Sequence, residues 1–327
     1  MEDLNPSDMK TILLSKRANI YYLEHTRILV KGGRVEYVAE RGKRSDYYNI
    51  PIANTTVIML GPGTSVTQAA IRYLAKAGVL LGFCGGGGTP FFGGTEWDGR
   101  ETEMLYVTPQ SEYRPTNYLQ SWVSFWFDEE KRLKAAKLFQ KKRLENISKG
   151  WFHNILTEQN FQPAETGLNN ALDRFSGKIE KAESTNDLLM HEAELTKKLY
   201  GNASRSCSIA EFKRSERGDS RDMANKMLDA GNYLAYGLGA ASAWVLGLPH
   251  GLAVLHGKTR RGGLVFDIAD IIKDALILPQ AFVSASNGED MREFRDRCIS
   301  NFLRYGAMDV MIDTVKETCQ EMQKEHE

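Results

Sequence analysis

The chain has 327 residues, with 42 Lys and Arg residues balanced by 42 Asp and Glu residues. An apolar fraction of 42% beside 26% charged residues is typical of a soluble globular protein of one to three domains, and it excludes a disordered, collagen-like or coiled-coil chain. Zero net charge removes the global electrostatic argument for a nucleic-acid partner, so such a partner must be inferred from local basic patches.

The N-terminal third is predicted to be β-rich with one helix. Strands are predicted at residues 19–23, 27–30, 35–38, 50–53, 56–60 and 79–83. The Gly32-Gly33 pair indicates a hairpin turn. Thr64 or Ser65 is expected to cap a helix that begins near Val66. These features predict a β-rich N-terminal domain over residues 1–108.

The rest of the chain is predicted to be mainly helical. Helices are predicted at residues 116–126, from 128 onwards, and at 164–183, 186–200, 222–248, 266–275 and 290–325. The stretch 202–221, rich in Ser, Arg and Lys, is predicted to be a mobile loop. The fold class is therefore α+β multidomain, with a mainly α-helical domain over residues 109–327.

Several features indicate a cytoplasmic protein that does not associate with membranes. The first ten residues carry acids where a secretory signal has basic residues. The four cysteines show no Cys-x-x-Cys spacing, which disfavours a disulfide framework and a zinc site. The longest apolar run, residues 233–248, is shorter than the roughly 20 residues that a bilayer requires, and it predicts a buried helix.

Glu192 lies on an apolar helical face with Leu188, Leu195 and Leu199. A buried carboxylate is costly unless it is paired, protonated or bound to a metal. A salt bridge to a neighbouring helix and metal ligation therefore both remain open for Glu192.

Three further carboxylates, Asp267, Asp270 and Asp274, are spaced so that they share one face of a helix. Like charges on one face repel each other, whereas a hard divalent ion accepts several carboxylate ligands. An alternative to metal binding, for any one of these acids, is that Asp267 caps the helix and that Lys273 compensates the negative charge nearby. The full triplet favours a metal site.

His256 follows an apolar stretch and precedes a basic turn that contains Lys258, Arg260 and Arg261. Metal ligation and a hydrogen-bonded core position are both open for this histidine. A mixture of Glu, Asp and His ligands suits Mg²⁺ or Mn²⁺ better than structural zinc, and such ligands fit phosphodiester chemistry.

A second basic segment, residues 131–149, contains eight Lys or Arg residues opposed by Glu145 alone. Lys134, Lys137 and Lys141 lie on one face of its predicted helix. This pattern fits either phosphate binding or a solvated helix face.

The order of these motifs resembles the CRISPR-associated integrase and endonuclease family, Cas1. The motifs are Glu192-Ala193, Asp222-x-x-Asn225-x-x-Leu228-Asp229, His256 and Leu264-Val-Phe-Asp267-x-x-Asp270. The segments 231–238 and 249–263 are similar to the type I-F branch in particular. The resemblance covers the whole chain.

The resemblance implies that the helical domain is catalytic and that Glu192, His256 and Asp270 bind Mg²⁺ or Mn²⁺. Asp267 would be the fourth catalytic residue, as the neighbouring acid. The wider family often has Glu where this chain has Asp270, which leaves open which of the two aspartates contacts the metal. As a further hypothesis, Lys258, Arg260 and Arg261 contact flanking phosphates.

The resemblance also implies partners and a reaction. The protein would form a homodimer through its N-terminal domains and bind double-stranded and branched DNA. It would also bind the second CRISPR adaptation protein, which in type I-F is fused to a helicase-nuclease. The expected function is insertion of new spacers into a CRISPR array by attack of a DNA 3′ hydroxyl. Two alternatives are a structure-specific nuclease for branched DNA in repair and a non-catalytic dimeric DNA-binding scaffold.

Overall fold

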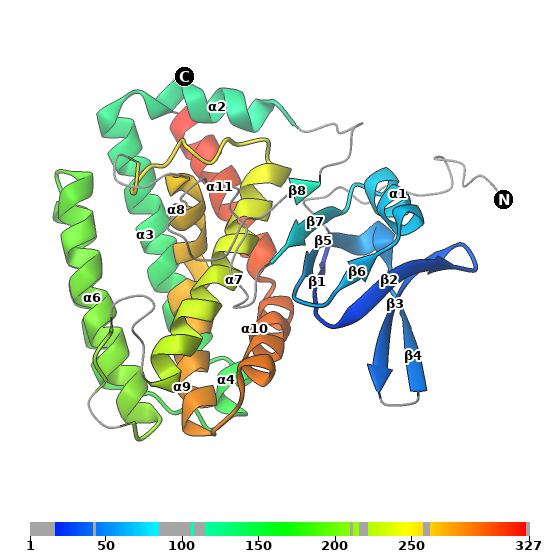
Figure 1. Cartoon of the computed structure of the whole chain (residues 1–327). Coiled ribbons are helices and arrows are strands. Elements are labelled where there is room, and N and C mark those ends of the chain that lie inside the picture. The colour runs from blue at the N-terminus through cyan, green and yellow to red at the C-terminus, as the bar shows by residue number, and fades with distance from the viewer. Residues whose placement is uncertain are drawn as a thin grey trace. The chain divides into compact units, whose positions relative to one another are not determined.

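The computed structural model describes residues 17–41, 44–84, 106–107, 115–209, 212–215, 222–257 and 262–324. The chain divides into two compact units, Met1–Arg114 and Pro115–Glu327. The described part of the first unit consists mainly of strands and contains one nine-residue α-helix. The described part of the second unit is mainly helical (Figure 1). This arrangement confirms the predicted α+β fold class.

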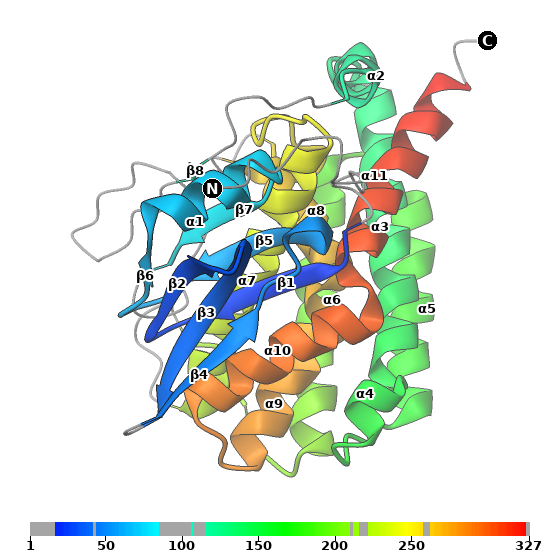
Figure 2. The ribbon, with the colours of Figure 1, turned by 90° about the vertical axis from the view of Figure 1, so that its right-hand side faces the viewer.

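The first unit contains two four-stranded sheets. One has the order β1 (Asn19–Leu23), β5 (Thr55–Leu60), β7 (Leu80–Phe83) and β8 (Tyr106–Val107), with only the last pair antiparallel. The other has the order β4 (Arg44–Asn49), β3 (Arg34–Arg41), β2 (Thr26–Lys31) and β6 (Ser65–Val66). In Figure 2, β2, β3 and β4 follow one another as an antiparallel meander. The predicted hairpin is confirmed, since Lys31 pairs with Arg34 across two glycines at positive φ.

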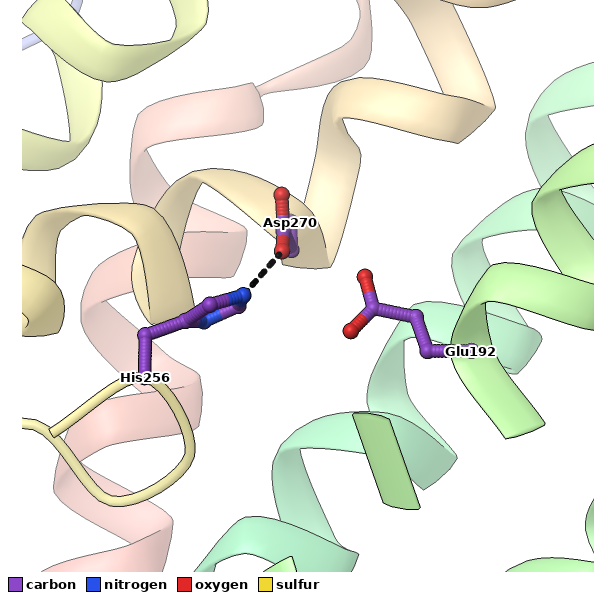
Figure 3. A group of neighbouring side chains, drawn as sticks. All are labelled: Glu192, His256 and Asp270. Carbon is purple, nitrogen blue, oxygen red and sulfur yellow. Dashed lines mark ion pairs between the residues drawn. The ribbon is translucent and has the colours of Figure 1, made fainter. Parts of the chain in front are cut away.

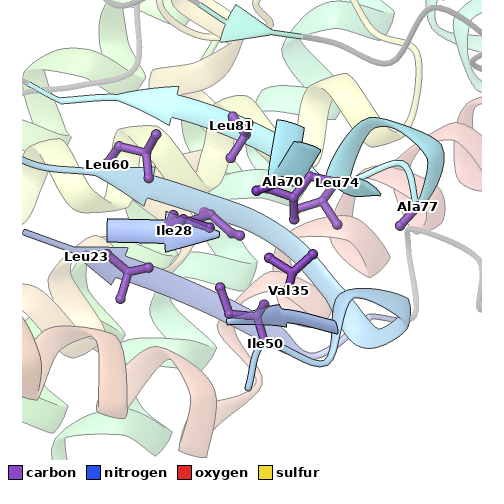
Figure 4. Close-up of a cluster of buried hydrophobic side chains, with 11 residues drawn as sticks. Leu23, Ile28, Val35, Ile50, Leu60, Ala70, Leu74, Ala77 and Leu81 are labelled. Carbon is purple, nitrogen blue, oxygen red and sulfur yellow. The ribbon is translucent and has the colours of Figure 1, made fainter. Parts of the chain in front are cut away.

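A buried apolar cluster holds the first unit together (Figure 4). It joins both sheets to α1 (Gln68–Lys76), whose Ala70 and Leu74 are fully buried. The predicted cap was wrong by two or three residues. Ser65 is in β6, which pairs with β2, and Thr67 caps α1 by accepting a hydrogen bond from the Ala70 amide at 3.3 Å.

One strand prediction in this unit was also wrong, and strand β4 was not predicted. Residues 50–53 form no strand, because a 3-10 turn, η3 (Ile52–Asn54), occupies that position. Strand β4 was missed because its sequence, RSDYYN, has no apolar alternation, and four of its first five side chains are exposed.

The described part of the second unit consists mainly of helices. They are α2 (Asn117–Trp126), α3 (Glu129–Trp151), α4 (Asn154–Thr157), α5 (Glu165–Lys181), α6 (Thr185–Ser206), α7 (Met223–Val245), α8 (Gly263–Ile272), the π-helical segment η4 (Lys273–Ile277), α9 (Leu278–Ser286), α10 (Met291–Tyr305) and α11 (Ala307–Gln323). The cap of α3 is Asp128, as the acidic start predicts. Within the described residues, no helix is long and apolar enough to cross a bilayer.

Helices α7 and α8 lie against each other at the centre of this unit. A Cβ on Gly239 would lie 2.8 Å from the Val265 carbonyl oxygen, so glycine is required for this close approach. Residues 233–248, predicted as a buried helix, form most of α7 and its C-terminal turn. This packing places α8 in the interior, where its carboxylates lie.

Three helix predictions in the second unit need correction. The predicted helix 290–325 is broken into α10 and α11 by Gly306, which adopts a left-handed φ of 69°. Helix α6 extends to Ser206, so the start of the predicted mobile loop is helical. The helix predicted to end at residue 275 continues through η4 into α9, because Pro279 lies in the first turn of α9, where its missing N–H is tolerated.

Candidate metal centre

Three side chains from different elements converge in the second unit (Figure 3). Glu192 comes from α6, His256 from the loop after α7, and Asp270 from α8. One ligand atom from each lies within 4.8 Å of the other two, and His256 Nε2 is 4.0 Å from Asp270 Oδ2. The structure therefore brings together three of the four predicted catalytic residues.

The position of Glu192 follows from the apolar face of α6. Leu188, Leu195 and Leu199 are buried, as predicted, and only 12% of the Glu192 side chain is exposed. Burial raises the pKa of Glu192 and outweighs the opposing charge of Arg143. Arg143 Nη1 lies 2.8 Å from Glu192 Oε1, so the predicted alternative of a salt bridge to a neighbouring helix is also present.

Asp270 is buried on α8 and is paired with Lys273. Burial alone would raise the pKa of Asp270, but the charges of Lys273, His256 and Arg143 lower it below its ordinary value. Burial likewise would lower the pKa of Lys273, and Asp270 raises it. Asp270 is thus an ionised carboxylate held inside the protein, which is a suitable ligand for a hard cation.

Asp267 is outside the cluster and organises the loop that carries His256. Its side chain has 0% exposure, and it accepts hydrogen bonds from the amides of Val254, Leu255 and His256 at 2.7, 3.0 and 3.1 Å. Its Oδ1 also lies 2.7 Å from His256 Nδ1. This contact occupies Nδ1 and leaves Nε2 facing Asp270, which is the usual orientation of a histidine ligand supported by a carboxylate.

The hydrogen bond to Asp267 also affects the protonation of His256. Burial alone would lower the pKa of His256, but this bond and the charge of Asp270 raise it above its ordinary value.

The three aspartates predicted to share one helical face have different main partners. Asp267 holds the His256 loop, Asp270 pairs with Lys273, and Asp274 pairs with Arg143.

Two tryptophans of α2, which the sequence analysis did not single out, hold the same loop. Trp122 Nε1 donates to the Leu252 carbonyl at 2.9 Å, and Trp126 Nε1 donates to the Ala253 carbonyl at 2.7 Å. The signal in the sequence is their i, i+4 spacing, which places both on one helical face. The His256 loop is therefore fixed by α2 as well as by α8.

We expect Trp126→Phe to weaken this support. The variant replaces the indole with a phenyl ring and removes the donor to Ala253, which should lower the free energy of unfolding by about 0.5–1.5 kcal/mol. Urea denaturation measures this effect. A control on the same helix, Gln120→Ala, changes an exposed side chain and should leave the stability unchanged. Equal values for Trp126→Phe and the wild type would show that this hydrogen bond contributes nothing.

The cluster opens into a cavity of about 720 Å³. Besides the three cluster residues, its lining includes the cations Lys197, Lys213, Arg214 and Lys273. Of these four, only Lys273 is predicted from the sequence to lie near the acids, and only as a compensating charge. A cavity with carboxylates at one point and several cations around it suits a polyanionic substrate beside a metal ion.

The predicted DNA-binding lysines of α3 lie outside the described lining of this cavity. Lys134 is 3.8 Å from Glu321 Oε1, Lys141 is 2.6 Å from Glu180 Oε1, and Lys137 donates to the Glu180 carbonyl. The other predicted DNA-binding residues, Lys258, Arg260 and Arg261, lie outside the described residues.

The fold and the cluster together define a class of protein. A β-sheet unit precedes a helical unit that holds a Glu-His-Asp cluster beside a basic cavity, as expected of an enzyme that uses a divalent metal on phosphodiesters. The chain belongs to the family described as CRISPR associated protein Cas1, whose model matches residues 20–312.

Curated relatives support this assignment over nearly the whole chain. The chain is 57% identical over 321 residues to the CRISPR-associated endonuclease Cas1 of Pseudomonas aeruginosa, covering 98% of each protein. It is 58% identical over 319 residues to that of Pectobacterium atrosepticum, covering 97% of each. Both fit the predicted type I-F branch. The chain is therefore an enzyme of the nuclease and integrase type, which implies a divalent metal.

Solved structures share the fold. A Cas1 protein from Thermotoga maritima superimposes with a TM-score of 0.66 at 15% identity, over 93% of this chain and 96% of that one. A casposase bound to its integration product gives the same TM-score at 14% identity, over 93% and 91%.

Proposed function

We propose that this protein inserts new DNA into a CRISPR array, with Glu192, His256 and Asp270 as the ligands of Mg²⁺ or Mn²⁺. The observation that carries the proposal is the convergence of these three side chains within 4.8 Å, inside a cavity lined with cations. Two carboxylates and an imidazole match the ligand preferences of Mn²⁺ and, with water, of Mg²⁺.

The reaction is a transesterification in which a DNA 3′ hydroxyl attacks the phosphorus of a phosphodiester. One P–O bond forms and another breaks. The attacking hydroxyl loses its proton, and the leaving 3′ oxygen takes one up. Glu192, His256 and Asp270 would hold a divalent ion, which would supply polarisation of the phosphate and stabilisation of the charge on the leaving oxygen. Lys273, beside Asp270, adds a fixed positive charge at the same point, and Asp267 keeps the imidazole of His256 oriented.

The proposal includes partners. Solved structures of similar fold include a complex of TtCas1 with DNA and a Cas6-RT-Cas1–Cas2 complex, which support DNA and a second adaptation protein as partners here. In the type I-F branch, that second protein would be fused to a helicase-nuclease. A homodimer formed through the N-terminal units completes the proposed assembly.

A cleavage experiment tests the metal and the chemistry. Purified protein is incubated with labelled branched DNA in Mn²⁺, in Mg²⁺ and in EDTA. We expect strand cleavage or strand transfer in one or both metals and none in EDTA. DNA binding that is insensitive to EDTA, with no chemistry in either metal even when the second adaptation protein is added, would favour the non-catalytic scaffold.

We also propose that Lys134, Lys137 and Lys141 contact DNA phosphates. Lys134 and Lys141 form exposed ion pairs and Lys137 donates to the Glu180 carbonyl, and such exposed contacts are weak, so phosphates can replace them. Changing all three to Gln should weaken binding of every DNA sequence and lower the slope of log K against log salt by up to about 3. Fluorescence anisotropy at several salt concentrations measures the slope. An unchanged slope would remove this face from the DNA path.

A further inference from the structure

Arg143 is a buried guanidinium that joins three elements of the helical unit. It belongs to α3, and only 1% of its side chain is exposed. Its Nη1 lies 2.8 Å from Glu192 Oε1, and its Nη2 donates to Thr196 Oγ1 at 3.1 Å, both on α6. Its Nε donates to Asp274 Oδ2 at 2.9 Å, in η4. One side chain therefore contacts both helical segments that flank the cluster.

The contacts on each side are suited to fixing a position. Glu192 and Thr196 are one turn apart, so Arg143 grips a single face of α6. Asp274 lies one turn after Asp270 and is itself held, because Trp151 Nε1 donates to its carbonyl oxygen at 2.8 Å. π-Helical turns such as η4 occur frequently at functional sites. The guanidinium thus connects the helix of Glu192 to the segment that follows Asp270.

The chemistry of arginine explains the choice of residue. A planar guanidinium offers five N–H donors in a fixed geometry, whereas a lysine ammonium is a point charge on a flexible stem. Only arginine reaches Asp274 through Nε while Nη1 and Nη2 contact α6. Stability alone explains the arrangement poorly, because well-packed apolar residues often stabilise a core as well as a buried ion pair does.

We propose that Arg143 is a positioning residue that sets Glu192 at the distance from Asp270 and His256 that a divalent ion requires. This inference rests on the proposed function, in which Glu192 is a metal ligand. In this role Arg143 itself contacts neither the substrate nor the metal. Its effect acts through Glu192, with Thr196 and Asp274 holding the guanidinium in place.

Arg143→Lys separates the geometry of the guanidinium from its positive charge. If Arg143 acted only as a nearby charge, a lysine at this position would leave metal binding near the wild-type value. If it positions Glu192, its removal weakens metal binding, as loss of a residue that orients a ligand typically does by about 10–100-fold.

The test measures Mn²⁺ affinity directly, without DNA, from the electron paramagnetic resonance signal of free Mn²⁺. The wild type is compared with Arg143→Met, Arg143→Lys and the ligand variant Asp270→Asn. We expect Arg143→Met and Arg143→Lys each to raise the Mn²⁺ dissociation constant by about 10–100-fold, while circular dichroism shows native helix content. Weak Mn²⁺ binding by Arg143→Lys, which keeps the positive charge, would show that the geometry of the guanidinium matters and not its charge alone.

The outcomes distinguish this inference from the proposed function. Mn²⁺ binding that Asp270→Asn abolishes, but that folded Arg143→Met leaves equal or tighter, overturns the role of Arg143 alone. Absence of binding in the wild type, or equal binding in Asp270→Asn, overturns the proposed metal site and this inference with it. If both Arg143 variants fail to fold, Thr196→Val decides, with an expected weakening of roughly 2–10-fold. Unchanged affinity in that variant overturns the inference.

Discussion

Asp270→Asn will abolish metal-dependent cleavage and strand transfer, with a loss of roughly three orders of magnitude or more. The variant keeps the volume of the side chain and a hydrogen-bond acceptor for the half-buried Lys273, so that Lys273 is not left without a partner. What it removes is the negative charge that a divalent ion requires. Cleavage of labelled branched DNA in Mn²⁺ measures the effect, and circular dichroism and urea denaturation confirm that the variant is folded.

His256→Ala supplies the matching test on a second element. His256 lies on a loop, and 13% of its side chain is exposed, so its removal should cost less stability than the loss of a core residue. We expect the same loss of chemistry and unchanged affinity for DNA. Full activity in folded His256→Ala would exclude it as a metal ligand, and activity retained in both variants would refute the proposed centre.

Local patterns of the sequence singled out the residues of the cluster, because each is a polar residue in apolar surroundings. Glu192 interrupts the apolar face of α6, and Asp270 interrupts the apolar run of α8. Strand β1 and the start of α3 were predictable for the same reason, since alternation and an acidic cap act over a few residues. The resemblance to the family then implied a metal-binding role for these residues, which stays a proposal.

The supporting residues were not predictable, because their partners lie far away in the sequence. Arg143 appears in the sequence as one more cation of a basic helix, yet it pairs with Asp274, 131 residues later. The Trp122 indole donates to Leu252, 130 residues later. Asp267 was grouped with Asp270 by helical spacing, but spacing does not show that the His256 loop folds back over its side chain. Such contacts arise from tertiary packing and leave no periodic signal.

Asp267→Asn is expected to lower both stability and activity, for a reason that differs from the Asp270 case. Oδ2 of Asp267 accepts the amides of Val254 and Leu255, and Oδ1 accepts the amide of His256 and faces its Nδ1. Asparagine has one acceptor oxygen, so its NH₂ group would face donors and leave them unsatisfied in the interior. Each such loss costs about 1–3 kcal/mol, which predicts a total of roughly 2–5 kcal/mol.

Urea denaturation measures this loss, and Asp313→Asn is the control. The Asp313 side chain is 62% exposed and pairs with Lys316 one turn away, so its replacement should change stability by less than about 0.5 kcal/mol. The activity of Asp267→Asn should fall by about 10–100-fold, because the imidazole of His256 loses the acceptor that orients it. A stability equal to the wild type would contradict the role of Asp267 in holding the loop.

The same variant decides which of the two aspartates of α8 contacts the metal. If Asp267 acts through the loop, Asp267→Asn loses stability even in EDTA and binds Mn²⁺ more weakly only to the extent that His256 is misplaced. If Asp267 were itself a ligand, Mn²⁺ affinity would fall as far as in Asp270→Asn while stability in EDTA stayed near the wild-type value. We expect the first result, because four hydrogen-bond donors already surround the two oxygens of Asp267, whereas Asp270 lies in the cavity beside Glu192.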